Sequence, residues 1–387
     1  MMTGREVTLE RLAVLERAVP FLAVDPEIDW SILNILGMIA RNDQTRRLLH
    51  IFSISAMLAM AACTSDAPPQ PTLVERSRIS MGSQLALSAW TADQRQTEIA
   101  FEHVFREFDR LEALMSVWKD GSDVVRLNKS AGVGPVHISP ETLEVLEIAH
   151  DASVLTNGKF DVTFGALAEI WKFDHDQDNS IPDRSAIDKR LPLVDFDEVE
   201  TNRQGGWAFI RKPGMRVHLG GIGKGYAVDR AVAMLRQQRL TDFMIQSGGD
   251  LFVSGANGGK PWKLGIADPR GAHDVFASLE LGDGTFSTSG DYERSFIKDG
   301  VRYHHLIDPD RGEPAHGCRS VTIVTNRAVI ADVLSTGVFI MGPDDGMALI
   351  EKLPDVEGVI VTSGNQVLVS SGLKGRIALL KQPTDSP

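Results

Sequence analysis

Cysteine is nearly absent from this 387-residue sequence, and positive charge is in the minority. The two cysteines, Cys63 and Cys318, are too few for a disulfide framework. Lys and Arg number 40 against 52 Asp and Glu, and the net charge of −12 excludes the broad basic surface of a nucleic-acid-binding protein. A phosphate-bearing ligand would therefore have to be bound locally, by a metal ion, a few placed cations or backbone amides.

A long hydrophobic span is also missing near the N-terminus, where the apolar run covers only residues 51–62. A membrane-spanning helix needs about 20 residues, whereas this run, preceded by Arg46 and Arg47, has the length of a signal peptide. The residues Met-Ala-Ala-Cys that end at Cys63 resemble a bacterial lipobox, in which the cysteine is lipidated. A buried helix is the alternative interpretation.

These features predict four segments along the chain. Residues 1–37 precede a signal of ordinary length that starts at Met38, so we interpret them as a spurious extension before a lipoprotein signal peptide over 38–62. A polar, Pro-rich tether over 63–75 and a globular domain over 76–380 follow. We therefore expect a lipid-anchored protein on the periplasmic face of a bacterial cell envelope, with the inner membrane as the first expectation.

The apolar pattern of the globular part predicts many strands and few helices. Helices are predicted at 92–115, 139–155, 227–235 and 328–341, and strands at 78–89, 207–211, 216–219, 243–247, 262–267, 276–281, 302–307, 319–325 and 358–370. Residues 174–190 are polar and charged, which indicates a surface excursion. Because helices and strands do not alternate strictly, a single α+β domain is predicted and not a doubly wound sheet.

The segment 218–229, HLGGIGKGYAVD, is the most informative local pattern, because it joins a predicted strand to a predicted helix through glycines. Glycine allows backbone to approach a ligand closely, and Lys224 adds a positive charge beside that approach. The free N–H groups at the N-terminus of a helix attract phosphates. The pattern indicates a phosphate-binding turn, although a tight turn without a ligand has the same signature.

The apolar helix predicted at 328–341 carries three oxygen-bearing side chains on one face. Asp332, Ser335 and Thr336 stand at positions i, i+3 and i+4. A buried carboxylate needs a partner, and magnesium prefers such oxygen ligands together with the phosphates of a substrate. The alternative is a polar stripe that is satisfied by water or by the helix's own carbonyls.

Several different short motifs follow one another along the chain. They lie at 81–83, 115–118 with 122–128, 158–165, 218–229, 247–250, 289–294, 305–309 with Gly312 and Pro314, and 331–336. In this order and spacing, from about residue 76 to 375, the sequence resembles the FAD:protein FMN transferases of the ApbE family. Each motif alone carries little information, and it is their joint order that carries the resemblance.

The resemblance implies a fold and a reaction. The fold is a single α+β catalytic domain related to the T-fold. Members of the family split FAD between its phosphates with Mg²⁺, release AMP, and attach FMN through a phosphoester to a Thr or Ser hydroxyl of a partner protein. The implied partners carry a motif of the type D-G-x-[ST]-G-A-[TS], as in subunits of sodium-pumping quinone reductases and related electron-transport complexes, and in exported flavin reductases.

The resemblance also implies site residues. It assigns Mg²⁺ to the side chains of Asp332 and Thr336, with Ser335 as a further ligand, and to the carbonyl of Gly221. It assigns FAD to Met81, Trp118, Lys159, Phe160, Asp161, His218, Lys224 and Ile307. His218 stands where the family usually has Asp, and Ser335 where a carboxylate is common. These two departures weaken the expected contacts to FAD and to the metal.

For the reaction itself, we predict in-line attack of the acceptor hydroxyl on the FMN phosphorus, with Lys224 offsetting charge on the pyrophosphate. His305 and Asp291 are the candidates for orienting or deprotonating the hydroxyl. A structural hydrogen bond is the alternative role for His305, and a turn cap the alternative for Asp291. Two other functions use the same residues: an FAD pyrophosphatase that yields FMN and AMP, and a non-catalytic exported FAD-binding lipoprotein.

Overall fold

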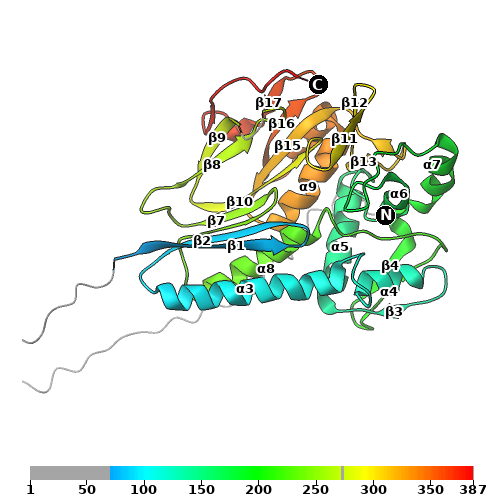
Figure 1. Cartoon of the computed structure of the whole chain (residues 1–387), viewed down its shortest axis with the longest axis horizontal. Coiled ribbons are helices and arrows are strands. Elements are labelled where there is room, and N and C mark those ends of the chain that lie inside the picture. Colours follow the sequence, from blue (N-terminus) through cyan, green and yellow to red (C-terminus); the bar gives the residue numbers. More distant parts are fainter. Residues whose placement is uncertain (1–69, 272–273, 387) are drawn as a thin grey trace, which may run out of the picture. The chain divides into compact units, whose positions relative to one another are not determined.

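The computed structural model describes residues 70–271 and 274–386, and its largest element is an antiparallel sheet (Figure 1). The strands, in order across this sheet, are β1 (Thr72–Ser80), β2 (Ser83–Thr91), β6 (Phe243–Ser247), β7 (Asp250–Ser254), β10 (Asp283–Gly290), β15 (Cys318–Thr325), β16 (Glu357–Thr362) and β17 (Val367–Val369). All of these neighbours pair antiparallel, so the sheet is built from hairpins and longer returns.

Both faces are buried at the centre of the sheet, because side chains there alternate between two cores. On β7, Phe252 packs into the larger core, whereas Leu251 and Val253 pack into a second core on the opposite face. Helices α3 (Gln94–Met115), α8 (Gly223–Gln237) and α9 (Ala328–Met341) cover the first face. A small sheet of β8 (Trp262–Ala267), β9 (Val275–Leu281) and β18 (Ile377–Leu379) shares the second core with the large sheet.

The remaining elements lie outside these two sheets, and many of them are grouped on one side of α9 (Figure 1). The helices are α4 (Asp123–Lys129), α5 (Pro140–Leu155), α6 (Gly165–Trp171), α7 (Arg184–Arg190) and α10 (Pro343–Ile350), with short 3-10 turns at Leu191–Leu193, Phe196–Glu198 and Ser371–Leu373. The strands are β3 (Val136–His137), β4 (Val199–Asn202), β5 (Trp207–Ile210), β11 (Ser295–Lys298), β12 (Val301–His304), β13 (Ile307–Asp308) and β14 (Glu313–Pro314). The predicted single α+β domain is confirmed.

The long predicted helices are confirmed, and their ends follow the expected capping chemistry. α3 buries the apolar stripe that includes Phe101, Phe105 and Phe108, and the side chain of Asp93 accepts a hydrogen bond from Gln96 N at its start. α5 begins with Pro140 after Ser139, whose hydroxyl accepts from Thr142 N. Periodicity and caps therefore specified these helices locally.

Several strand predictions are wrong. The strand predicted at 78–89 is a hairpin, because Met81 and Gly82 both adopt positive φ and reverse the chain. The strand predicted at 216–219 is extended chain whose Val217 N–H and C=O bond to the side chain of Asn128 instead of a strand. The strand predicted at 302–307 ends at His304, and that at 358–370 divides into β16 and β17.

Two predicted segments also change. β1 begins at Thr72, so the last residues of the predicted tether at 63–75 belong to the sheet. The predicted surface excursion at 174–190 includes α7, whose Ile187 is buried.

The predicted signal peptide and Cys63 lie outside the described residues, and Cys318 is buried with a free thiol. Within the described part of the chain, no helix combines the length and apolarity needed to cross a membrane.

Gly225 is where α8 and α9 approach most closely. A Cβ atom at this position would lie 2.5 Å from the carbonyl oxygen of Ala328 and 2.7 Å from Cβ of Asp332. We expect Gly225→Ala to lower the free energy of unfolding by roughly 1–3 kcal/mol, because the two helices must separate. Urea unfolding measures this. Gly223→Ala is the matched control, since its Cβ would meet only Met81 Cε at 3.6 Å; equal losses in both variants would contradict the packing argument.

Candidate active site

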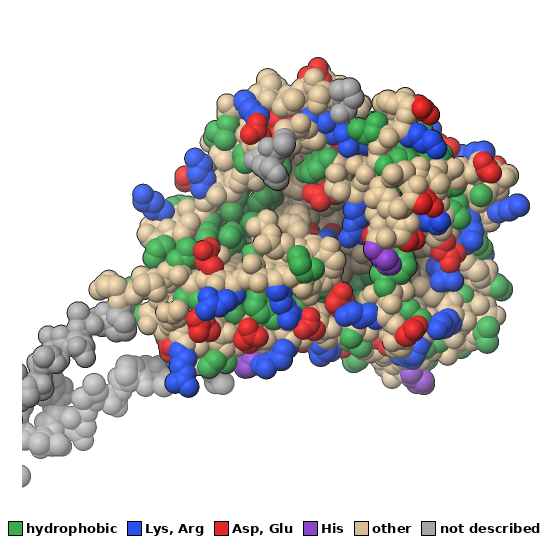
Figure 2. Space-filling view, viewed as in Figure 1, with side chains coloured by type: hydrophobic (Ala, Val, Ile, Leu, Met, Phe, Trp, Pro, Cys, Tyr) green, Lys and Arg blue, Asp and Glu red, His purple; other side chains and the backbone are tan. Residues whose placement is uncertain are grey.

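A cavity of about 450 Å³ opens beside the N-terminus of α8, and a second of about 470 Å³ adjoins it. The two share part of their walls, including Trp118, Asp174, His218, Lys224 and Arg294. The space-filling view shows a hollow on this face, with positive and negative side chains around it (Figure 2). Each cavity has a volume typical of small-molecule sites, which span roughly 300–1,000 Å³.

Most of the predicted site residues line the first cavity. Those on its wall are Trp118, Lys159, Phe160, Asp161, His218, Gly221, Lys224, His305, Ile307, Asp332 and Thr336. Met81 lines only the second cavity. Ser335 is fully buried behind the wall, and Asp291 lines neither cavity. The fold therefore brings together the two patterns that the sequence singled out, the glycine-rich turn and the oxygen-bearing face of α9.

Lys224, in the first turn of α8, points at two carboxylates. Its Nζ donates to Asp250 Oδ2 at 2.7 Å and lies 4.0 Å from Asp332 Oδ1. Burial by itself would lower the pKa of Lys224, but the two carboxylates outweigh it and raise the pKa above the usual value. Asp250 is held in turn by Ser287, whose hydroxyl donates to Oδ1 at 2.5 Å. Lys224 is thus a fixed positive charge at the cavity wall.

Asp332 is the buried carboxylate of this wall. Its Oδ2 accepts from the backbone N–H of Gly225 at 2.9 Å, which ties α9 to the start of α8. Burial and the nearby Asp250 raise the pKa of Asp332, and the charge of Lys224 offsets only part of that rise. A further cation in the cavity would therefore stabilise the ionised form of Asp332.

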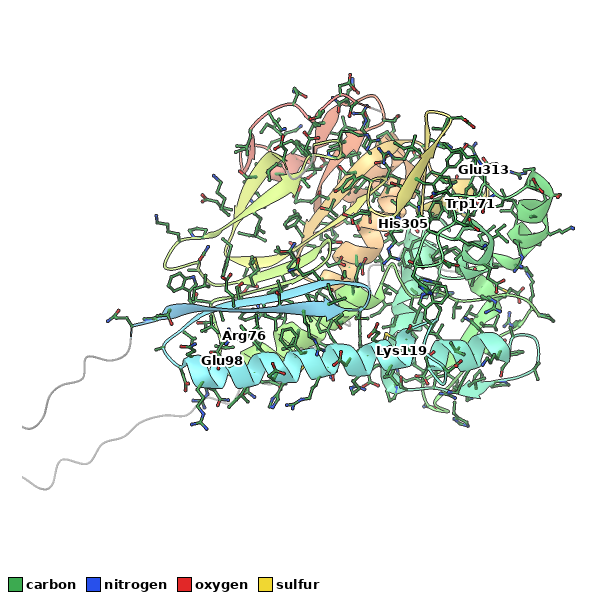
Figure 3. All side chains as sticks on the ribbon, viewed as in Figure 1. Arg76, Glu98, Lys119, Trp171, His305 and Glu313 are labelled. Atoms are coloured by element: carbon green, nitrogen blue, oxygen red, sulfur yellow. The ribbon has the colours of Figure 1, made fainter. Side chains whose placement is uncertain are left out.

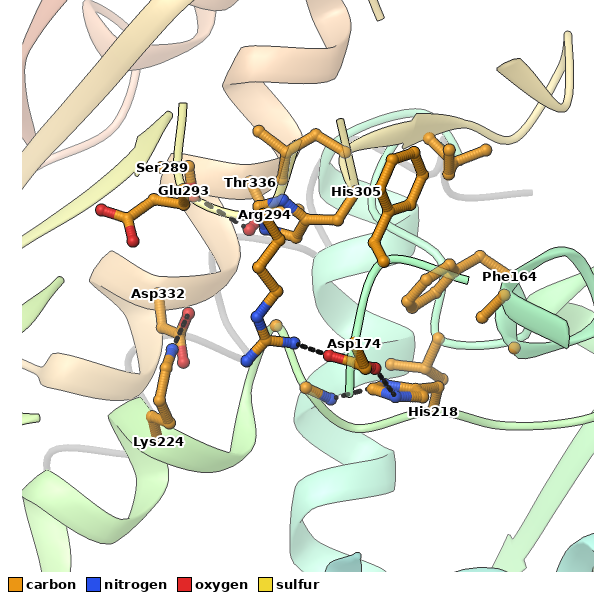
Figure 4. A pocket seen from close by; sticks show the side chains of 18 of the residues that line it. Phe164, Asp174, His218, Lys224, Ser289, Glu293, Arg294, His305, Asp332 and Thr336 are labelled. Atoms are coloured by element: carbon orange, nitrogen blue, oxygen red, sulfur yellow. Dashed lines mark hydrogen bonds and ion pairs between the residues drawn. The ribbon is translucent and has the colours of Figure 1, made fainter. Parts of the chain in front are cut away.

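Hydroxyl groups surround Asp332 on the same helix. Ser335 Oγ donates to the carbonyl of Asp332 at 3.0 Å and lies 2.8 Å from Ser289 Oγ. Thr336 Oγ1, which faces the cavity, is 3.2 Å from Ser289 Oγ. A Cβ at Gly221 would lie 3.6 Å from Thr336 Oγ1, so the glycine lets the backbone pass beside this hydroxyl. Ser335 is partnered within the protein, whereas Asp332 and Thr336 present oxygen to the cavity (Figure 4).

His218 occupies the wall opposite Lys224 as a neutral imidazole. Its Nδ1 accepts from Gly220 N at 3.1 Å, its ring lies 5.4 Å from that of Phe164, and its Nε2 is 3.9 Å from Asp174 Oδ2. Burial lowers its pKa despite the neighbouring Asp174. A ligand on this side would meet a neutral ring instead of the carboxylate that the family pattern carries here.

The two adjacent histidines after β12 have different surroundings. His304 Nε2 donates to the carbonyl of Ala315 at 2.9 Å and its Nδ1 accepts from Leu306 N, so its ring holds the chain reversal. His305, labelled in Figure 3, lines the cavity. Its Nδ1 is buried without a hydrogen-bond partner among the described residues. Burial, Arg294 and His304 lower the pKa of His305 to about 3. His305 is therefore a cavity-lining imidazole with a lowered pKa, and its buried Nδ1 has no partner among the described residues.

The other predicted contacts have partners already. Lys159 Nζ donates to Asp308 and Asp310, both at 2.8 Å. Asp161 accepts from the N–H and the hydroxyl of Thr163, and burial raises its pKa to about 6 despite these bonds. Trp118 is half exposed, and the ring of His175 packs edge-on against it at 4.2 Å.

Asp291 is a structural residue in this geometry. Arg270 donates to both of its oxygens, at 2.6 and 2.7 Å, and both side chains are buried. The predicted role as a base is not supported by this position, because Asp291 lines neither cavity. The sequence did not reveal the partner, which lies in a separate loop.

We expect Asp291→Ala to destabilise the fold by about 3–5 kcal/mol, because it leaves the Arg270 guanidinium buried and unpaired. Chemical unfolding measures the loss. The double variant Arg270→Met/Asp291→Leu is the control, and it should recover much of that stability because the unpaired charge is gone. A stable Asp291→Ala variant that has lost activity would restore Asp291 as a catalytic candidate.

Sequence reasoning missed several residues of the wall. The motif at 289–294 assigns no role to Arg294, and the sequence predicts a surface excursion at Asp174, yet both residues line the two cavities and bond to each other at 2.5 Å. Ser289 was likewise only part of a motif. No local signal separates Asp174 from its neighbouring acidic residues, because its partner is 120 positions away.

Comparisons with known proteins identify the family of this chain. Residues 81–360 match the ApbE family. A protein of Klebsiella pneumoniae named FAD:protein FMN transferase is 31% identical over 306 residues, which cover 79% of this chain and 94% of the relative. One of Treponema pallidum with the same name is 32% identical over 302 residues, 74% of this chain and 83% of the relative.

Solved structures resemble the chain over the same region. The ApbE protein of Thermotoga maritima superposes with a TM-score of 0.73 at 32% identity, and the flavin transferase ApbE of Vibrio cholerae with 0.71 at 28%. Each match covers 79% of this chain and 99% of the other. The motifs, the α+β fold and the sequence matches all point the same way, and the chain belongs to the ApbE family.

Proposed function

We propose that the protein is a transferase that moves FMN from FAD to a Thr or Ser hydroxyl of an acceptor protein and releases AMP. The observation that carries the proposal is the convergence of Lys224, Asp332 and Thr336 on one wall of a cavity that the N-terminus of α8 also borders. Relatives named FAD:protein FMN transferases support the same reaction.

The chemistry is substitution at phosphorus. The acceptor oxygen forms a bond to the phosphorus of the FMN half, the bond from that phosphorus to the bridging oxygen breaks, and its electron pair leaves with AMP. Lys224 offsets the charge that grows on the pyrophosphate oxygens. His305, whose ring lines the cavity, accepts the proton of the hydroxyl, since a bound polyanion raises the pKa of a nearby imidazole.

The proposal includes Mg²⁺ as the metal of the site. Asp332 and Thr336, with the carbonyl of Gly221 beside them, form an all-oxygen donor set with a single carboxylate. Among the described residues no group of three or more His, Cys, Asp or Glu could hold a metal alone. This sparse set fits Mg²⁺, which commonly binds through one or two carboxylates and the phosphates of its substrate. When bound, the ion would offset charge on the pyrophosphate.

Incubation of the protein with FAD, Mg²⁺ and an acceptor that carries a D-G-x-[ST]-G-A-[TS] motif tests the function. Flavin fluorescence that stays on the acceptor in a denaturing gel is the expected result. Free FMN and AMP without labelled acceptor would indicate a pyrophosphatase, and intact bound FAD would indicate a storage protein. Acceptor candidates are subunits of sodium-pumping quinone reductases or related electron-transport complexes, and exported flavin reductases.

We further propose that Cys63 carries a lipid that anchors the protein to the periplasmic face of the cell envelope. The apolar run before Cys63 and the Pro-rich segment after it support this location. Metabolic labelling with a fatty acid should mark the wild-type protein and not a Cys63→Ser variant. Equal labelling of both would exclude Cys63 as the anchor.

A further inference from the structure

The cavity that would take FAD has no free positive charge among the described residues. Four cationic side chains line it, and each is paired with a carboxylate: Lys159 with Asp308 and Asp310, Arg216 with Glu169, Lys224 with Asp250, and Arg294 with Asp174. A pyrophosphate brings negative charge to a wall whose cations are already neutralised. A direct hydrogen bond from one of these four side chains to a phosphate would therefore compete with a carboxylate that is already bound there.

Of these five carboxylates, Asp310 shares Lys159 with Asp308, so its movement alone would not free the lysine, and three others are held by regular structure or by further bonds. Asp250 is 1% exposed and is fixed by Ser287. Asp308 lies on β13 and also accepts from Asp310 N, and Glu169 lies on α6. Moving any of them would disturb a strand or a helix.

Asp174 is the exception. It belongs to residues 172–183, which form no helix or strand between α6 and α7. Its carboxylate accepts from Arg294 Nη1 at 2.5 Å and lies between Arg294 and His218 on the wall shared by the two cavities (Figure 4). A carboxylate on an arginine offers the same charge and fork geometry as a phosphate.

The residue next to Asp174 contacts a second part of the site. His175 packs edge-on against Trp118 with 4.2 Å between the ring centroids, and the indole is half exposed. One displacement of this segment would therefore release both the Arg294 guanidinium and the Trp118 ring. A dinucleotide has an anionic middle and flat ends, so it could use both groups at once.

We propose that Arg294 binds a phosphate of FAD, and that the carboxylate of Asp174 occupies the position of this phosphate until the ligand displaces residues 172–183. The inference rests on the proposed function and names a specificity residue for the same site. Arg294 lines both cavities, so its guanidinium can hold the phosphates of a ligand that extends from one cavity into the other. Flavins without phosphate gain nothing from this exchange.

Equilibrium binding of FAD and of riboflavin to the full chain tests the proposal. Arg294→Gln should raise the Kd for FAD about 10- to 100-fold, the loss of a charged hydrogen-bond pair. Asp174→Asn should lower it several-fold, because the competing charge is gone, and should have no such effect in an Arg294→Gln background. Riboflavin affinity should stay the same in all three variants.

Arg203→Gln is the matched control, because Arg203 pairs with Glu147 on the surface and lines neither cavity. An unchanged FAD Kd in Arg294→Gln, or an equal loss for riboflavin, would overturn the proposal. Either result would leave the proposed function standing if the wild-type protein still labels its acceptor. Failure of the wild-type protein to bind FAD at all would instead contradict the proposed function.

Discussion

Asp332→Asn is expected to reduce flavin transfer by roughly 100-fold or more at limiting Mg²⁺. Losing a residue that only hydrogen-bonds a metal ligand typically costs about 10- to 100-fold in activity or metal affinity, and losing the ligand itself should cost more. Asparagine keeps the size of the side chain and an oxygen for the Gly225 N–H, but it lacks the charge that faces Lys224 and the cavity. Initial rates of acceptor labelling over a range of Mg²⁺ concentrations measure the effect.

The stability of this variant separates a chemical effect from a folding defect. Asp332 is buried beside Asp250, and both factors raise its pKa, so neutralising it removes an unfavourable charge from the apoprotein. We therefore expect the Asp332→Asn fold to be at least as stable as wild type. Asp344→Asn, the same change at an exposed position on α10, is the control for activity. Wild-type labelling by Asp332→Asn would remove the metal assignment.

The candidate site could be predicted from sequence where local rules fix the geometry. Helical spacing puts Asp332 and Thr336 on one face of α9, and the glycine-rich turn puts Lys224 in the first turn of α8. Neither rule states that the two helices meet. Gly225 provides that contact, because its missing Cβ lets α9 approach within bonding distance of the α8 backbone.

The rest of the site depends on contacts between distant segments, which periodicity does not encode. β7 and β10 were not predicted as strands, although both lie inside the large sheet, because their register comes from neighbours far along the chain. The partners of Asp174 and Asp291 lie on other loops, so the sequence alone does not show which of the two carboxylates belongs to the site. It predicts Asp174 on the surface and Asp291 as a candidate base. The structure moves Asp174 into the site and Asp291 out of it.

The two departures from the family pattern have structural consequences. His218 uses Nδ1 to accept from Gly220 N and stays neutral, so its Nε2–H can donate one hydrogen bond, and the ring cannot repel a phosphate as Asp would. Ser335 bonds to Ser289 and to the helix carbonyl of Asp332. Asp332 is thereby left as the only carboxylate that α9 contributes to the described cavity wall.

Lys224→Met is expected to have two separate effects. Loss of the cation should weaken FAD binding about 10- to 100-fold, as for other charged hydrogen bonds. It should also lower the free energy of unfolding by up to about 3–5 kcal/mol, because Asp250 and Asp332 then share a buried site without a cation. Flavin fluorescence titration measures the first effect, and urea unfolding measures the second.

The pH dependence of the second effect has a definite sign. Without Lys224 the folded-state pKa of Asp332 rises further above its unfolded value, so the folded protein binds the proton more tightly and gains stability as pH falls. The deficit of Lys224→Met should therefore be largest at neutral pH and shrink in acid. The double variant Lys224→Met/Asp250→Asn should recover stability without recovering FAD affinity, since it relieves the paired carboxylates but restores no cation. Recovery of both by the double variant would show that Lys224 acts on FAD only by holding Asp250 in place.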